Sequence, residues 1–273
     1  MDIEIASLSF TYPSSVTALR KVSLSIGTGE AVAIIGQNGA GKTTLVKHLN
    51  GLLKPTHGQV RVGSWDTRER SVAQLAARVG YVFQNPDDQL FQRTVRAEVM
   101  FGPRNLGWAK NRAAAQAETT LNMVGLLEQA GRHPYDLSPG DRRLVALAAV
   151  LAMDTPVIVL DEPTTGLDYA GVERIGRIVD DLRAKGRTLI TITHDMDFCA
   201  EHFERVVVLA KGRLLLDGPS RSVFAQADVL AQSDVDPPQL ARLASRLGLE
   251  TVPLTVEEFI AEVGQAGKTE FRK

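Results

Sequence analysis

The chain has 273 residues, an ordinary globular composition and a formal net charge of −1. This length suits one large domain with or without a small appendage, and the near-neutral charge gives no support to binding of nucleic acid or an acidic lipid surface. The single cysteine, Cys199, excludes a disulfide framework, and the longest apolar run, Leu144 to Met153, is far shorter than the roughly 20 residues of a membrane span.

Alternating apolar residues near the N-terminus predict two half-buried antiparallel strands. Ile3 and Ile5 begin the pattern, residues 22–26 repeat it, and a turn at residues 11–15 separates the two. Tyr12 lies in this turn, where its flat ring could stack on an adenine or could pack on its own hairpin. The residues by themselves leave both interpretations open.

A glycine-rich stretch follows the apolar run at residues 31–35 and precedes a second apolar segment, which is the order strand, tight turn, helix. Its residues are Gly36, Gln37, Asn38, Gly39, Ala40, Gly41, Lys42, Thr43 and Thr44. Their spacing fits G-x-x-x-x-G-K-[ST], a loop whose backbone amides bind phosphate, and the helix dipole adds to the attraction. Lys42 is predicted to reach the β- and γ-phosphates of a nucleotide, and Thr43 to hold Mg²⁺. A plain glycine-rich turn with an exposed lysine is disfavoured, because both spacing and context match.

The rest of the chain predicts strands that alternate with helices and hence a mostly parallel sheet. The predicted elements are the phosphate-loop helix ending at Asn50-Gly51, strands over 58–62 and 79–83, helices over 94–106, 111–124 and 140–153, a buried strand over 157–160, a helix over 169–183, a strand over 188–193, a hairpin over 205–209 and 213–216, a polar linker over 233–238, helices over 240–247 and 256–263, and a frayed end over 267–273. The three helices between residues 94 and 153 predict a helical subdomain inserted into the α/β core.

Polar residues at the ends of three predicted strands carry the chemistry. Asp161 ends the buried strand and could hold Mg²⁺, and Glu162 beside it could act as general base toward water. His194 ends the next strand and could orient that water or contact the γ-phosphate. Gln84 could ligate Mg²⁺ through its amide oxygen, although alone it would read as a polar residue at a strand end.

Residues 137–141, Leu-Ser-Pro-Gly-Asp, make a well-formed helix start. Ser138 suits the N-cap, Pro139 the first helical position and Asp141 the capping-box acid. A functional interpretation is that Ser138 and the amide of Gly140 present an anion site at this helix end.

These motifs, in this order, resemble the ATP-binding cassette (ABC) ATPases over about residues 3–224, and 166–168, Gly-Leu-Asp, complete the set. The resemblance implies ATP as substrate, Mg²⁺ as cofactor and a head-to-tail dimer in which each ATP lies between Lys42 of one subunit and Ser138 and Gly140 of the other. It implies further that Asp168 couples the two sites, that Tyr12 stacks on adenine, and that Glu162, His194 and Gln84 serve hydrolysis.

One motif departs from the family pattern, which is Leu-Ser-Gly-Gly-Gln. Pro139 replaces a glycine and has no amide hydrogen to donate, and Asp141 replaces the glutamine and adds negative charge near phosphate. The change is compatible with one weakened composite site and with pairing to a non-identical subunit.

The segment 83–91, Phe-Gln-Asn-Pro-Asp-Asp-Gln-Leu-Phe, and the tail 236–243 resemble the ATPases of energy-coupling-factor transporters, which take up vitamins or the transition-metal ions cobalt and nickel. In those systems the residues after the glutamine line a groove for a transmembrane subunit. The ATPase of a conventional importer, and a non-transport cassette acting on DNA or ribosomes, are the alternatives; the second is disfavoured because there is no coiled-coil insertion or second cassette.

The expected domains are an ABC ATPase domain over 1–228, with the helical subdomain over about 86–155, and a C-terminal helical extension over 229–273. The expected partners are a second ABC ATPase subunit, identical or not, a transmembrane coupling subunit and a substrate-binding membrane subunit, without nucleic acid. The first four residues are acidic rather than typical of a signal peptide, so we expect a chain that is soluble by itself and lies on the cytoplasmic side of the cell membrane through its partners.

Overall fold

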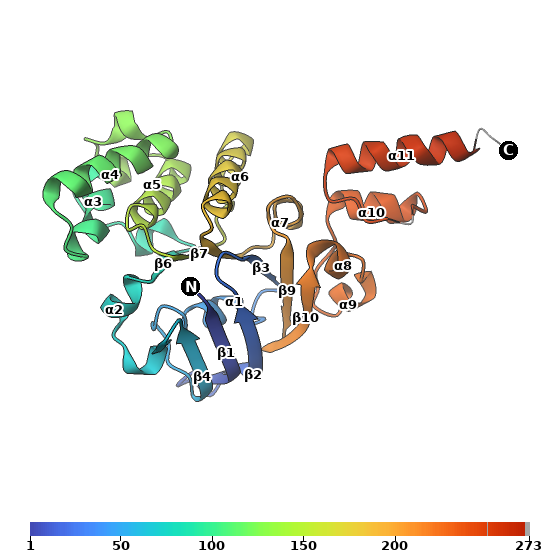
Figure 1. Ribbon diagram of the computed structural model, residues 1–273, viewed down its shortest axis with the longest axis horizontal. Coiled ribbons are helices and arrows are strands. Elements are labelled where there is room, and N and C mark those ends of the chain that lie inside the picture. Colours follow the sequence, from blue (N-terminus) through green and yellow to red (C-terminus); the bar gives the residue numbers. More distant parts are fainter. Residues whose placement is uncertain (250, 271–273) are drawn as a thin grey trace.

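The computed structural model describes residues 1–249 and 251–270 and contains an α/β core, a helical subdomain on one side and a helical extension on the other (Figure 1). This arrangement confirms the expected fold class, an α/β P-loop core with an antiparallel β subdomain, inserted helices and C-terminal helices. Within the described residues, no helix is both long and apolar enough to cross a membrane.

The first sheet is antiparallel. Its strands are β1 (Ile3–Thr11), β2 (Thr17–Ile26), β4 (His57–Val62) and β5 (Trp65–Asp66), in the order β2-β1-β4-β5. Ile3 pairs with Ile26 and Ile5 with Leu24. All four side chains are buried because alternate residues of a strand point to the same face, so the predicted antiparallel strand pair is confirmed.

The second sheet is parallel except at one edge. Its strands are β3 (Ala31–Ile35), β6 (Val79–Val82), β7 (Val157–Asp161), β8 (Thr188–Ile192), β9 (Arg205–Ala210) and β10 (Arg213–Pro219), in the order β10-β9-β3-β8-β7-β6, with β10 antiparallel to β9. Ala33 and Ile35 of β3 face one hydrophobic cluster, and Val32 and Ile34 face the cluster shared with the first sheet. Burial on both faces explains the uninterrupted apolar runs of these strands.

The inserted helices of the expected fold are present, and each begins and ends within two residues of its predicted limits. Helices α3 (Val95–Asn105), α4 (Lys110–Met123) and α5 (Pro139–Leu151) pack on one another, and α5 also contacts β6. Hydroxyl oxygens cap two of them: Thr94 accepts from the amide of Ala97 at 3.2 Å, and Ser138 accepts from that of Asp141 at 3.1 Å.

The other helices are mostly short. They are α1 (Lys42–Val46), α2 (Val72–Ala76), α6 (Tyr169–Ala184), α7 (Met196–His202), α8 (Ser220–Phe224) and α9 (Ala227–Ala231), with single 3₁₀ turns over Thr67–Glu69, Pro86–Asp88, Leu127–Gln129 and Pro134–Asp136. The predicted extent of α1 to Asn50 was wrong. Amides of His48 and Leu49 donate three residues back rather than four, so the segment after Val46 tightens into turns up to Gly51.

The C-terminal extension holds α10 (Gln239–Arg246) and α11 (Val256–Glu270), which lie away from the β-sheets (Figure 1). The predicted frayed end was wrong for residues 267–270, which continue α11, while residues 271–273 lie outside the described residues. The prediction that residues 233–238 form a polar linker was also wrong in part. Ser233 is fully buried and Val235 belongs to the main hydrophobic cluster, so side-chain packing continues beyond residue 228. The domain boundary expected at that residue stays a prediction.

Candidate active site

The phosphate loop turns sharply between β3 and α1, and two of its glycines stand where neighbouring backbone leaves no room for a side chain. Gly36 has φ 145° and Gly41 has φ 104°. A Cβ atom would come within 2.1 Å of the Leu209 carbonyl oxygen at Gly36 and within 2.7 Å of the Ala18 carbonyl oxygen at Gly41. Only glycine fits these two positions without moving the neighbouring backbone.

The loop offers donors to an anion. Within the described part of the chain, the amides of Gly39, Gly41, Lys42 and Thr43 donate to no protein acceptor, as expected where a helix begins. Lys42 is 7% exposed, and its ammonium donates to the carbonyls of Gly36 at 2.5 Å and Gln37 at 3.0 Å. Burial lowers the pKa of Lys42, opposed by the charges of Glu162 and Asp161. A phosphate group fits this set of donors.

Asp161 lies at the end of β7 beside the loop. Its Oδ1 accepts from the Thr43 hydroxyl at 3.4 Å and its Oδ2 from the Tyr81 hydroxyl at 2.7 Å. Burial raises the pKa of Asp161, the Tyr81 hydrogen bond lowers it, and nearby Glu162 raises it; burial and Asp161 raise the pKa of Tyr81. Thr43 and Asp161 thus present hard oxygen donors of the kind Mg²⁺ prefers.

Asp161→Asn is expected to stabilise the protein measured without nucleotide and Mg²⁺. A carboxyl group whose pKa rises on folding contributes stability that is present below its unfolded pKa and is lost as pH rises through the folded pKa. Above that pH the buried carboxylate is charged, and this charge lowers the stability of the folded protein. The neutral amide of asparagine carries no such charge, so the melting temperature at pH 7.5 should rise by about 2–4 °C. The gain should shrink as the pH falls toward the range where the wild-type carboxyl is protonated.

Differential scanning calorimetry at several pH values measures this effect. Asp154→Asn is a matched control, because Asp154 is exposed and pairs with Arg187 at the surface. Equal melting temperatures of Asp161→Asn and wild type at pH 7.5 would contradict the assignment of an energetic cost to this carboxylate.

Glu162 and His194 lie in contact at the carboxyl end of the parallel strands. The Glu162 carboxylate lies 2.7 Å from His194 Nδ1, and the Glu162 side chain is 8% exposed whereas that of His194 is 66% exposed. Glu162 also accepts from the His194 amide at 3.3 Å. The Glu162 carboxylate thus lies directly after β7, at the carboxyl end of the sheet, and its contacts with His194 fix its position.

Two adjoining cavities join these residues to the loop. A cavity of about 480 Å³ is lined by residues including Gly36, Gln37, Asn38, Gln84, Glu162 and His194. A second, of about 390 Å³, is lined by Tyr12, the loop from Asn38 to Thr44, Gln84 and Glu162. The structure therefore brings together the predicted phosphate-loop residues, Gln84, Asp161, Glu162 and His194.

Tyr12 lies at the rim of the second cavity, but its ring is already engaged. Its hydroxyl lies 2.9 Å from the Thr44 hydroxyl, and the Phe10 ring packs edge-on to it at 4.8 Å. The ring therefore packs on its own hairpin, which is one of the two interpretations, and it also lines the cavity. Stacking on adenine stays a prediction.

Ser138, Gly140 and Asp168 lie apart from these cavities. Ser138 and Asp168 are exposed at the starts of α5 and α6, and Tyr169 beside Asp168 is 80% exposed. Ser138 donates its hydroxyl to the Asp141 carboxylate at 2.9 Å, and Asp168 accepts from the Gly171 amide at 2.8 Å. These residues face solvent, where a second molecule has access to them.

Sequence reasoning missed two contacts at the site. Arg143 donates to the backbone carbonyl of Glu162 at 2.8 Å, and the Ser233 carbonyl accepts from the Gln37 amide at 3.2 Å. Both use backbone atoms, which leave no signature in the sequence. The only available signal was an arginine on the apolar helix that begins at residues 137–141, the signature motif.

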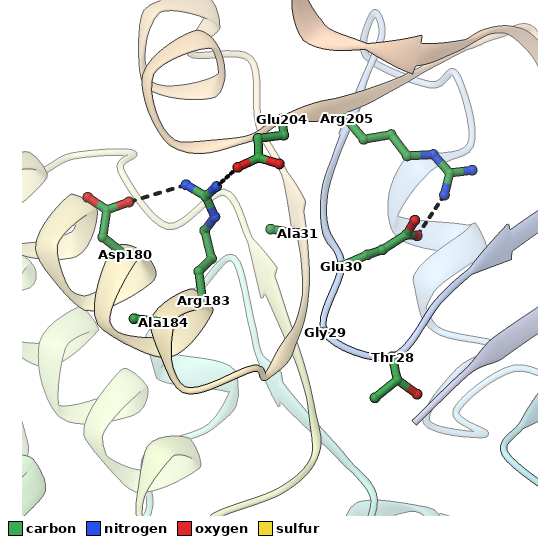
Figure 2. Close-up of a pocket in the computed structure, with 9 residues that line it drawn as sticks. All are labelled: Thr28, Gly29, Glu30, Ala31, Asp180, Arg183, Ala184, Glu204 and Arg205. Carbon is green, nitrogen blue, oxygen red and sulfur yellow. Dashed lines mark hydrogen bonds and ion pairs between the residues drawn. The ribbon is translucent and has the colours of Figure 1, made fainter.

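Another cavity, of about 660 Å³, lies at the opposite ends of the parallel strands, between Thr28–Ala31, Arg205 and the end of α6 (Figure 2). Its charges neutralise one another: Arg205 pairs with Glu30 at 2.7 Å, and Arg183 lies between Asp180 and Glu204. Open α/β sheets bind ligands at the carboxyl ends of their strands, so we assign the reaction to the phosphate-loop end.

The fold and this site define a P-loop nucleotide hydrolase. The family model described as ABC transporter matches residues 19–165, and the chain belongs to the ABC transporter family as an ATP-hydrolysing subunit.

Relatives extend the resemblance beyond the matched region. The chain is 41% identical over 267 residues to a protein of Methanothermobacter thermautotrophicus named energy-coupling factor transporter ATP-binding protein EcfA, covering 96% of this chain and 86% of the relative. It is 39% identical to the protein named EcfA2 of Streptococcus sanguinis, covering 95% and 98%. These relatives confirm the predicted resemblance to energy-coupling-factor ATPases.

Solved structures agree. CbiO1 of Clostridium perfringens, described as part of the ABC transporter complex cbiONQ, superposes with a TM-score of 0.75 at 32% identity over 90% of this chain and 98% of the other. The cassette MJ0796, described as a dimer in a post-hydrolysis state bound to ADP and Pi, gives a TM-score of 0.74 at 28% identity over 80% and 99%.

Proposed function

We propose that this chain is the ATP-hydrolysing subunit of an energy-coupling-factor transporter and powers uptake of a vitamin or transition-metal ion through a transmembrane partner. The observation that carries the proposal is the convergence of a phosphate loop, Asp161, Glu162 and His194 at one end of the sheet, with the signature residues exposed elsewhere. The names of the relatives support the transporter class.

In this proposal each side chain has one task. The free amides of the loop and the Lys42 ammonium hold the phosphates of ATP. Glu162 accepts the proton of the attacking water, and His194 helps to orient that water. Thr43, Gln84 and Asp161 supply the oxygen ligands of Mg²⁺, which neutralises phosphate charge when bound. Tyr12 at the rim stacks on the adenine.

The exposed signature supports a site shared between two chains. Ser138 and Gly140 contact the ATP held by the partner's loop, and Asp168 couples the two sites. The Ser138 hydroxyl is now satisfied by Asp141, so phosphate has to compete with that carboxylate, and Pro139 supplies no amide. The partner ATPase is a second copy or a related chain. The apolar residues exposed on the extension, including Leu247 (58%) and Ile260 (64%), support a contribution of that extension to pairing.

An apolar groove supports docking of a membrane subunit. It has a volume of about 240 Å³ and lies between the β6 edge and the helical subdomain. Phe91 is 60% exposed and Phe101 42% exposed, and their rings pack edge-on at 4.7 Å. Exposed aromatic pairs of this kind mark interaction sites. An apolar helix of a transmembrane coupling subunit fits the groove and brings the chain to the cytoplasmic face of the membrane.

Phe91→Asp is expected to reduce capture of the membrane subunits by at least about tenfold, because a carboxylate at the centre of an apolar contact costs more than about 1.4 kcal/mol. The measurement is affinity purification of the tagged chain from detergent-solubilised membranes, followed by mass spectrometry of the intact complex. Leu127→Asp is the control, since Leu127 is an exposed apolar residue outside the groove.

A small integral substrate-binding subunit in the captured complex would support the energy-coupling-factor assignment. A soluble external receptor in the captured complex would instead indicate that the chain belongs to a conventional importer. Undiminished capture by Phe91→Asp would contradict docking at this groove.

A further inference from the structure

The backbone at Glu162 is held in an unusual conformation. Its φ is 53°, in the left-handed region that non-glycine residues avoid. The Glu162 amide donates to the Ile192 carbonyl at 2.8 Å, and its carboxylate meets His194. The remaining polar group of the residue, its carbonyl, accepts from Arg143 at 2.8 Å and more weakly from the Thr165 amide at 3.4 Å. A strained backbone persists only where its surroundings fix it.

Arg143 reaches this carbonyl from a different part of the molecule. It lies in the first turns of α5, the helix that begins at the exposed Ser138, whereas Glu162 follows β7 of the core. Arg143 is half-buried, and its guanidinium bridges the two parts. One helix thus carries both the residue offered to a partner's ATP and the residue that holds the peptide of Glu162.

We propose that Arg143 is a positioning residue for hydrolysis: its hydrogen bond to the Glu162 carbonyl fixes the peptide after β7 and thereby the direction of the carboxylate. This inference rests on the proposed role of Glu162 as general base. Among the described residues, Arg143 forms no hydrogen bond or ion pair with that carboxylate or with the phosphate loop, so it acts through the Glu162 peptide. A shift of α5 on contact with a partner's ATP is transmitted by this bond to the Glu162 peptide.

Other contacts also hold this part of the fold. Glu162, Pro163 and Thr164 are buried, and the Ile192 hydrogen bond continues the sheet ladder to Glu162. The chain also contains a matched contact: Arg174 of α6 donates to the Val124 carbonyl of the helical subdomain, likewise at 2.8 Å. Arg174 therefore links core and subdomain by the same type of bond without contacting the site.

The test compares Arg143→Met and Arg174→Met in the full-length protein by steady-state ATP hydrolysis and melting temperature. Arg143→Met is expected to lower kcat by roughly 10- to 100-fold, the cost of a catalytic group misplaced by about 1 Å. Its KM for ATP should stay within about twofold, because nucleotide contacts are intact. Arg174→Met should keep wild-type kcat. Arg143→Lys keeps one donor, is available if Arg143→Met fails to fold, and should give an intermediate kcat.

Three results would overturn the inference. A wild-type kcat for Arg143→Met, with Glu162→Gln inactive, would refute positioning while leaving Glu162 as base. Equal losses of kcat in Arg143→Met and Arg174→Met would assign the effect to general loosening of the subdomain. Full hydrolysis by Glu162→Gln would instead refute the base itself, and with it any need to position it.

Discussion

Glu162→Gln is expected to lower kcat for ATP hydrolysis by roughly 10²- to 10⁴-fold, the usual contribution of a general base, while ATP binding is retained. Glutamine keeps the size of the side chain and can still contact His194 at the position where the carboxylate now lies 2.7 Å away. It cannot accept a proton from water. The loop amides and Lys42, which are proposed to hold the phosphates, are unchanged, so ATP affinity and the rate of hydrolysis should change independently in this variant.

Phosphate release and equilibrium binding of a fluorescent ATP analogue measure the two quantities. Glu118→Gln is the control, because Glu118 forms an exposed ion pair with Arg96, and such pairs contribute little. Hydrolysis by Glu162→Gln at the wild-type rate would show that another group takes the proton.

Lys42→Ala is expected to weaken ATP binding by about 100-fold, equivalent to about 2.8 kcal/mol. The ammonium is buried beside two carboxylates, and its pKa is lowered mainly by burial. Charge-assisted hydrogen bonds to phosphate therefore form in a site with little competing water, where each contributes about 1.5–3 kcal/mol. Without this cation, the charges of Asp161 and Glu162 repel the triphosphate.

Isothermal titration with ATP in the presence of Mg²⁺ measures this loss. Lys185→Ala, at the exposed end of α6, removes the same charge far from the site. Affinity of Lys42→Ala within about threefold of wild type would contradict the assignment of Lys42 to the phosphates, since the expected loss is 1.5–3 kcal/mol.

The core of the fold could be predicted from the sequence because the local sequence patterns agree with the tertiary packing. The uninterrupted apolar run at β7 is typical of a strand covered on both faces, and the predicted N-cap Ser138 marks the start of α5 correctly. The phosphate loop, Asp161 and His194 converge because parallel strands end at one edge of a sheet. The order of elements therefore predicts their proximity.

Other features depend on contacts that the sequence does not encode locally. α1 ends early because the segment up to Gly51 tightens into turns, and α8 and α9 are too short to show helical periodicity. Ser233 and Asp234 read as linker residues, but the Ser233 carbonyl meets the phosphate loop. The Arg143 bond likewise ends on a backbone oxygen, which any residue at that position supplies.

The central claim is that each chain contributes a phosphate loop and, separately, a signature helix start that serves another chain's ATP. The most direct test mixes Lys42→Ala with Ser138→Arg, each inactive alone. In a dimer with one copy of each, one site has an intact Lys42 facing an intact Ser138. Equal mixing should therefore restore about a quarter of the wild-type hydrolysis rate. Full activity of Ser138→Arg alone would contradict the claim, whereas no recovery in the mixture would mean that the partner is a related chain and not a second copy.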